Sequence, residues 1–204
     1  MNIYIDFDGT LFNTDQYTRD FMKIFNDYSI DNILFEKIKN KLFSNEKLFN
    51  LNVIIHYLLT HNNIDYELKD KIDSLLNSSY LFPEVHYCLK ELINIGYDLY
   101  LLTYGDDDFQ TFKINASNIA KYFKEIIITN KDKSELNLDY ENSIFIDNNP
   151  VEIEKIYNSK PKTLIRIKRD CDRYTKEKCK VSDIIECKDF NQVVKYLKGG
   201  FVNE

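Results

Sequence analysis

Short apolar runs recur along the chain, and the first of them leads directly into two aspartates. Residues 3–15 read IYIDFDGTLFNTD, in which Asp6 and Asp8 flank a single phenylalanine. Later runs of the same kind are DLYLLTYG, EIIIT, SIFIDN, TLIRI and DIIEC. Apolar runs of this length, bounded by polar or turn-forming residues, predict buried β-strands.

Segments with helical spacing separate most of these runs. Apolar residues three and four positions apart occur in LFPEVHYCLKELINIG, FQTFKINASNIAKYF, PVEIEKIY and NQVVKYL, a spacing that gives a helix one buried face. Strands that alternate with helices indicate a parallel sheet covered on both faces. The sequence therefore predicts an α/β fold with a three-layer, Rossmann-like core.

Residues 14–80 follow a different pattern. Helical spacing repeats in FMKIFNDY, ILFEKIKNKLF, LFNLNVIIHYLL and YELKDKIDSLL, with no strand pattern between them. We expect an inserted α-helical unit over residues 14–80, while residues 1–13 and 81–204 form the core with the sheet. The aromatic residues of this unit are expected to form its own small core: Phe21, Phe25, Phe35 and Phe49.

Composition narrows the range of partners. The 204 residues carry a net charge of -6, and an acidic surface repels a phosphate backbone, so we expect no nucleic-acid partner. The apolar stretches are much shorter than the roughly 20 residues that span a bilayer, and the N-terminus lacks the pattern of a signal peptide. These features predict a soluble cytoplasmic protein that does not bind a membrane.

The cysteines and histidines do not form a recognisable site. The four cysteines include no CxxC pair, and the last three lie in a Lys-rich segment with no nearby histidine, so we expect reduced thiols without a disulfide framework or a zinc site. The acidic run 106–108 is expected to be the solvated start of a helix, where carboxylates cap exposed amide groups.

Polar residues follow several of the predicted strands. In an open parallel sheet, ligands bind beyond the carboxyl ends of the strands. The residues at those ends are Asp6 and Asp8, then Thr103, Tyr104 and Gly105, then residues 129–133, and finally Asp147, Asn148 and Asn149. The topology therefore brings acidic, hydroxyl and amine groups to one edge of the sheet.

This combination of groups favours phosphate chemistry with a divalent cation. Clustered carboxylates repel one another, and Mg²⁺ bound by oxygen atoms, with waters and a substrate phosphate, would offset that repulsion. Thr103 can donate a hydrogen bond to a phosphate oxygen, and Lys133 offers a positive charge. Asp6 and Asp8 lie on the same side of an extended chain, so one can attack while the other handles a proton.

These motifs resemble those of the haloacid dehalogenase-like (HAD) hydrolase superfamily. The resemblance rests on DFDGTLFNTD, LFPEVHYCLKELINIGYDLYLLTYG, the lysine loop NKDK and SIFIDNNP, in the family's order. It implies that Asp6 is a nucleophile that forms an aspartyl-phosphate, and that Asp8 protonates the leaving group and then activates water. It also implies a helical cap at residues 14–80.

The resemblance further implies a ligand set. Thr103 and a loop lysine would bind phosphate, while Asp6, the backbone carbonyl of Asp8 and Asp147 would hold Mg²⁺. We also expect Tyr104 at the phosphate and Asn148 at the metal. The dehalogenases of the family lack an acid at the position of Asp8, so a phosphatase is favoured.

Two features depart from the family's pattern. Asn148 stands where a second acid is usual, although its carbonyl oxygen can still coordinate a metal, and Glu152 is an alternative source of a carboxylate. Lys131 and Lys133 both occur in the lysine loop, and we prefer Lys133 because it directly precedes SEL.

The sequence thus predicts a Mg²⁺-dependent phosphomonoester hydrolase that acts on a small phosphorylated metabolite. A mutase that transfers the phosphoryl group to a second hydroxyl would use the same residues. A non-catalytic protein that binds a phosphorylated ligand is a third possibility. The substrate and the oligomeric state do not follow from the sequence.

Overall fold

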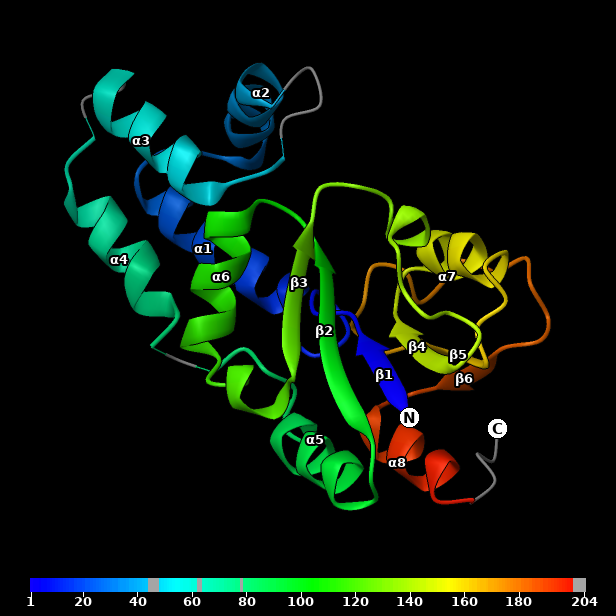
Figure 1. Cartoon of the computed structure of the whole chain (residues 1–204). Coiled ribbons are helices and arrows are strands. Elements are labelled where there is room, and N and C mark those ends of the chain that lie inside the picture. Colours follow the sequence, from blue (N-terminus) through cyan, green and yellow to red (C-terminus); the bar gives the residue numbers. More distant parts are fainter. Residues whose placement is uncertain (44–47, 62–63, 78, 200–204) are drawn as a thin grey trace. The chain divides into compact units, whose positions relative to one another are not determined.

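The computed structural model describes residues 1–43, 48–61, 64–77 and 79–199. Its strands follow the predicted apolar runs and form one six-stranded sheet (Figure 1). The strand bounds are β1 Asn2–Ile5, β2 Asp98–Tyr104, β3 Glu125–Thr129, β4 Ser143–Asp147, β5 Thr163–Ile167 and β6 Ile185–Cys187. The α/β fold predicted from the sequence is therefore confirmed.

The sheet is parallel, and its strand order is β3-β2-β1-β4-β5-β6. The chain builds outward from β1 through β2 to β3 in one direction and from β4 through β5 to β6 in the other. The order reverses between β1 and β4, and such a switch point leaves a crevice at the carboxyl ends of the strands. The ends of β1 and β4 are therefore the first place to search for a site.

Helices cover both faces of the sheet, as Figure 1 shows for α7 (Pro150–Tyr157) on one side and α5 (Val85–Asn94) with α8 (Phe190–Leu197) on the other. The helix α7 packs on an apolar cluster in which the rings of Tyr4 and Phe145 stack with centroids 4.8 Å apart. Members of this cluster are Tyr4, Leu102, Phe145, Ile153, Ile156 and Leu164. Alternate strand residues, including Ile3 and Leu101, are buried as well, as a sheet covered on both faces requires.

A second compact unit contains Gln16–Tyr80 and Gly105–Asn118. Its helices are α1 Thr14–Asp27, which starts in the core unit, α2 Asn32–Leu42, α3 Leu51–His61, α4 Glu67–Leu75 and α6 Asp107–Ala116. Phe21, Phe25 and Phe35 contact one another, with the ring centroids of Phe25 and Phe35 5.4 Å apart, while Phe49 packs on Phe109. The expected aromatic core is confirmed for Phe21, Phe25 and Phe35, whereas Phe49 is only half-buried and lies outside it. The domain boundaries 1–13 with 81–204, and 14–80, stay a prediction.

One predicted helix is interrupted. The sequence pattern indicated a single helix through residues 109–123, whereas α6 ends at Ala116 and a short 3₁₀ helix, η1, covers Ala120–Tyr122. Asn118 between them has φ +51°, a left-handed conformation that Asn tolerates better than most residues and that ends an α-helix. At the start of α6, Asp106 caps the helix by accepting the Phe109 N–H at 3.0 Å.

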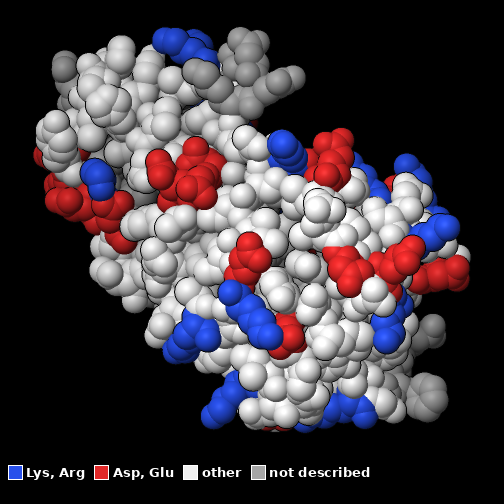
Figure 2. All heavy atoms as spheres, in the orientation of Figure 1, with Lys and Arg blue, Asp and Glu red and all other residues white. Residues whose placement is uncertain are grey.

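The face that Figure 2 shows carries scattered groups of acidic and basic side chains, and residues of other kinds make up most of it. Among the described residues, no helix combines the length and the apolar character that a membrane span requires.

Candidate active site

Two aspartates flank the switch point of the sheet. Asp6 directly follows β1, and its N–H donates to the Ile146 carbonyl at 2.9 Å, so the strand pairing continues to the edge. Asp147 is the last residue of β4. Both side chains are buried. The parallel register of β1 and β4 thus brings two acids, 141 positions apart in the sequence, to the same edge.

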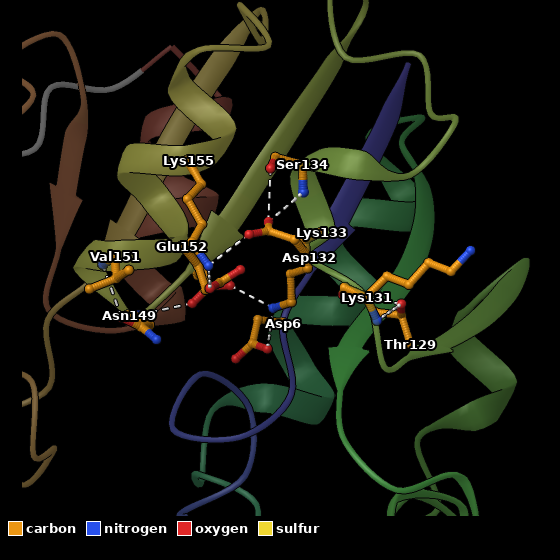
Figure 3. A network of polar contacts seen from close by, with 11 residues as sticks. Asp6, Thr129, Lys131, Asp132, Lys133, Ser134, Asn149, Val151, Glu152 and Lys155 are labelled. Carbon is orange, nitrogen blue, oxygen red and sulfur yellow. Dashed lines mark hydrogen bonds and ion pairs between the residues drawn. The ribbon is translucent and has the colours of Figure 1, made fainter. Parts of the chain in front are cut away.

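Lys133 joins these two acids. Its Nζ donates to Asp6 Oδ1 at 2.7 Å (Figure 3). It also donates to Asp147 Oδ2 at 2.7 Å. The Lys133 side chain is only 3% exposed. An ammonium group has three N–H donors, and these two contacts use two of them. Buried charges persist when they are paired and hydrogen-bonded, which is the arrangement found here.

The loop that carries Lys133 is anchored to α7. Asp132 caps the short 3₁₀ helix η2 (Lys133–Glu135) by accepting the N–H and the hydroxyl of Ser134. Lys155 of α7 pairs with Asp132 at 2.7 Å and with Glu152 at 3.0 Å (Figure 3). Glu152 is thus engaged with a lysine of its own helix.

The same loop distinguishes its two lysines. Lys131 is exposed, and its backbone N–H and carbonyl hydrogen-bond with the Thr129 hydroxyl. Lys133 is buried against both acids. The geometry therefore favours Lys133 as the lysine of the site.

The charges at this edge interact strongly. Burial is the largest cause that raises the pKa of Asp6 to about 7, and the neighbouring Asp147 carboxylate raises it further, while Lys133 acts in the opposite direction. Burial lowers the pKa of Lys133, but Asp147 and Asp6 outweigh this effect and raise it well above its ordinary value. One ammonium group therefore offsets the two carboxylates only in part, and a further positive charge would favour the ionised form of Asp6.

The loop after Asp6 is a tight turn that carries Asp8. The Phe7 carbonyl accepts the N–H groups of residues 10–12, and the Gly9 N–H donates to the Phe12 carbonyl at 2.8 Å. Gly9 has φ +81°, a conformation that favours glycine. Asp8 is half-buried, and its Oδ1 accepts the Thr14 hydroxyl at 2.7 Å. This contact fixes the position of Asp8 Oδ1.

Thr103 and Tyr104 end the neighbouring strand β2. Leu101 pairs with Ile5, so Thr103, two residues later, lies at the same edge as Asp6. The Thr103 side chain is 1% exposed, and its hydroxyl has no hydrogen-bond partner among the described residues. A buried hydroxyl without a partner is costly, and a bound ligand that accepts this hydrogen bond would remove the cost. The Tyr104 side chain is exposed.

Asn148 lies against the Asp8 loop rather than against Lys133. The Thr10 hydroxyl donates to Asn148 Oδ1 at 3.4 Å, and Asn148 Nδ2 donates to Asp172 Oδ2 at 2.8 Å. A Cβ atom on Gly9 would stand 2.0 Å from Asn148 Nδ2. Gly9 is thus required both by its backbone conformation and by the approach of this amide.

Asp172 and Arg169 did not emerge from the sequence. Both follow β5 in an irregular segment, and their contacts with Asn148 and with the Thr10 carbonyl join residues far apart in the chain. Periodicity and local motifs carry no signal for such contacts. The only hint was the density of charge in RIKRDCDRYTKEK.

The oxygen donors at this edge fit Mg²⁺ in kind. They are the carboxylates of Asp6 and Asp147 and the amide oxygen of Asn148, and Mg²⁺ commonly takes one or two carboxylates with waters and a phosphate. In the part of the chain that the structure describes, no three His, Cys, Asp or Glu side chains group closely enough to hold a metal. Protein carboxylates alone would therefore not complete the coordination.

Solved structures share this fold over nearly the whole chain. A HAD phosphatase from Thermococcus onnurineus matches with a TM-score of 0.68 and 17% identity, over 98% of this chain and 99% of that one. The HAD hydrolase YfnB from Bacillus subtilis, bound to magnesium, matches with a TM-score of 0.60 and 16% identity, over 96% and 97%. The L-2-haloacid dehalogenase from Xanthobacter autotrophicus matches with a TM-score of 0.66 and 13% identity, over 97% and 98%.

Sequence comparison adds nothing to this likeness. No protein-family model matches the sequence, and no curated protein matches it either. The structural matches confirm, for the fold, the resemblance that the motifs indicated, and the chain has the fold of the haloacid dehalogenase-like hydrolases. Phosphatases and dehalogenases share that fold, so the fold alone does not distinguish their chemistry.

Proposed function

We propose that the chain is a Mg²⁺-dependent phosphomonoester hydrolase that acts through an aspartyl-phosphate on Asp6. The observation that carries the proposal is the buried contact of Asp6 with Lys133 at the switch point of the sheet. A carboxylate held there by one oxygen keeps its second oxygen for attack, beside a positive charge that suits a phosphate.

Two groups would bind the phosphoryl oxygens. Lys133 has a third N–H donor beyond those given to Asp6 and Asp147. The unpartnered hydroxyl of Thr103 offers a neutral donor from the neighbouring strand. Donors fixed before the substrate arrives stabilise charge that develops on phosphoryl oxygens without reorganising during the reaction. Tyr104, which is exposed, would contact the leaving group rather than the phosphate.

The two aspartates would divide the chemistry. Asp6 Oδ2 attacks phosphorus, the bond from phosphorus to the ester oxygen breaks, and Asp8 gives its proton to that oxygen. Asp8 then takes a proton from water, the water oxygen attacks phosphorus, and the bond to Asp6 breaks to release inorganic phosphate. The Thr14 hydroxyl that donates to Asp8 Oδ1 would help to orient this carboxylate for the proton transfers.

The metal would be held by Asp6, Asp147 and Asn148, with the backbone carbonyl of Asp8. When bound, Mg²⁺ supplies positive charge that offsets the phosphate and keeps Asp6 ionised. The raised pKa of Asp6, caused by burial and by Asp147, is consistent with a need for such a charge.

Asp8 is the reason to prefer phosphate esters to haloacids. A phosphate ester needs a proton for its leaving oxygen, whereas a halide leaves without one. An acid two residues after the nucleophile, at the same edge, suits the first reaction. We propose that the helical unit contributes to substrate choice, as caps do in the family that the motifs resemble.

The test is Mg²⁺-dependent release of phosphate from p-nitrophenyl phosphate. We expect turnover that EDTA abolishes and that Asp6→Asn reduces by about three orders of magnitude or more. The control variant is Asp170→Asn, an exposed carboxylate, which should behave as the wild type. Chloride release from 2-chloropropionate by the wild type, with no phosphate release, would overturn the proposal in favour of a dehalogenase.

Further substrates would refine the assignment. Sugar phosphates and nucleoside monophosphates are the first compounds to assay with Mg²⁺. If a sugar phosphate is converted to an isomer without release of phosphate, the protein is a mutase. Tight binding of such compounds without turnover, with several divalent metals, would identify a binding protein.

A further inference from the structure

We infer that Asp172 is a positioning residue that fixes the Asn148 amide with its nitrogen toward Asp172 and its carbonyl oxygen toward the loop that carries Asp8, where the oxygen would serve the proposed Mg²⁺ site. The inference rests on the proposed function, because it concerns how an amide can serve at a metal site. It extends that proposal to a residue from the loop between β5 and β6, a segment with no part in the motifs.

The orientation of Asn148 follows from the chemistry of its partner. An ionised carboxylate accepts hydrogen bonds and donates none. Asp172 Oδ2 lies 2.8 Å from the amide nitrogen of Asn148, so the nitrogen must face Asp172 and the oxygen must face the opposite way. The assignment of N and O in an asparagine usually rests on such a network, and here one partner decides it.

Both the nitrogen and the oxygen of the amide also lie close to the loop that carries Asp8. The Thr10 hydroxyl donates to Asn148 Oδ1 at 3.4 Å. This contact is long for a hydroxyl donor, so the oxygen keeps capacity for a stronger partner. Gly9 leaves the space in which the amide lies, since a Cβ there would stand 2.0 Å from Nδ2. The amide is therefore enclosed by Gly9, Thr10 and Asp172.

Two arginines hold the segment that supplies Asp172. Arg169 is buried, and its guanidinium donates to the Thr10 carbonyl at 2.9 and 3.2 Å and to Glu84 at 2.8 Å. The Arg173 N–H donates to Asp15 Oδ2 at 2.9 Å. Asp172 thus lies between two residues that contact the chain after Asp8, at Thr10 and at Asp15. Its carboxylate has little freedom to leave Asn148.

The Asp172 carboxylate also affects the charge on the oxygen of the Asn148 amide. Hydrogen bonds in a chain polarise one another, so the Asp172 charge increases the negative charge on Asn148 Oδ1. Groups behind a metal ligand typically change metal affinity by about 10- to 100-fold. Asp172 would in this way supply, through Asn148, part of the effect of the acid that Asn148 replaces.

The experiment compares three proteins with the wild type. Asp172→Asn removes the charge and lets the Asn148 amide turn. Asp170→Asn makes the same change at an exposed carboxylate two residues earlier. The exchange variant Asn148→Asp with Asp172→Asn keeps one carboxylate facing one amide. Mg²⁺ affinity is measured by calorimetry, and the side-chain amide signals of Asn148 are followed by NMR without metal.

We expect Asp172→Asn to weaken Mg²⁺ binding about 10-fold or more and to shift the Asn148 amide signals. Asp170→Asn should leave both unchanged, and the exchange variant should recover affinity. Unchanged affinity in Asp172→Asn would overturn the inference. If the exchange variant does not recover Mg²⁺ affinity, Asp172 has a structural role only, and this result would also overturn the inference.

The proposed function can fail separately. A wild-type protein that binds Mg²⁺ but hydrolyses no phosphate ester contradicts the hydrolase, while the effect of Asp172 on affinity is still measured. A wild-type protein that does not bind Mg²⁺ contradicts both.

Discussion

Replacing Asp6 by Asn should abolish turnover and at the same time stabilise the folded protein above neutral pH. Burial, followed by the charge of Asp147, raises the pKa of Asp6 from 3.8 to about 7. Each pKa unit corresponds to about 1.4 kcal/mol, so ionised Asp6 costs the folded state up to about 4 kcal/mol. Asparagine has the same shape without the charge, and its amide oxygen can still accept from Lys133.

The Asp6→Asn variant should recover only part of this cost. Without the Asp6 charge, Lys133 loses one of its two carboxylate partners among the described residues, so we expect a net gain of about 1–2 kcal/mol. For a chain of this size the gain corresponds to a Tm increase of about 2–8 °C. Active-site residues are often retained at a cost to stability, and this variant would measure that cost.

The pH dependence provides the sharper test. Because the folded-state pKa of Asp6 is raised, its contribution to stability is fully present below the unfolded-state pKa and is lost as pH rises through the folded-state pKa. The difference in unfolding free energy between Asp6→Asn and wild type should therefore grow from about pH 4 to about pH 7 and then level off. Urea unfolding in EDTA, at steps of about one pH unit, measures this difference.

Asp170→Asn, at an exposed position, is the matched control and should show no such trend. A difference that is flat across this pH range would refute the reasoning. A lower midpoint for Asp6→Asn at about pH 8 would also refute it, because Lys133 would then compensate fully for burial and for Asp147.

Three further predictions concern single residues. Gly9→Ala places a Cβ against Asn148 Nδ2 at a positive φ and should destabilise the protein by about 1–3 kcal/mol in urea unfolding. Thr103→Val keeps the shape of the side chain but removes a buried hydroxyl without a partner among the described residues, so stability should hold or rise by about 1 kcal/mol. Phosphate release should nevertheless fall about 10- to 100-fold in a steady-state assay. Burial raises the pKa of the Cys187 thiol to about 12, so iodoacetamide at about pH 8 should label exposed Cys171 and spare Cys187 until the protein unfolds, as peptide mass spectrometry would show.

The sequence predicted the sheet because its signal is local. Each strand is a short apolar run, and the residues that end β1 and β4 stand next to those runs in the sequence. Once the strands are taken as parallel, Asp6 and Asp147 must meet at one edge. The prediction of one helix through residues 109–123 was wrong. The apolar spacing continues across Asn118, but spacing does not show that the backbone of Asn118 is left-handed.

Local sequence patterns could not predict the contacts around Asn148. Asp172 is 24 positions from Asn148, and Arg169 is 159 positions from Thr10. These contacts depend on how the irregular segment after β5 returns over the Asp8 loop, and no periodicity describes such a path. A substitution that departs from a motif therefore needs the structure before its effect can be judged.

Lys133 contributes both to the proposed phosphate site and to the charge balance of the proposed metal site. From the sequence, we expected a lysine to bind phosphate and the carboxylates to bind a metal, as two separate groups of residues. In the folded chain the ammonium lies 2.7 Å from both acids, so it already provides part of the positive charge that the carboxylates require. A phosphate that accepts a hydrogen bond from the third N–H of Lys133 would weaken the stabilisation that Lys133 gives to ionised Asp6. A bound cation would then contribute more to keeping Asp6 ionised. Metal and phosphate should therefore bind cooperatively at this edge, each strengthening the other through Lys133.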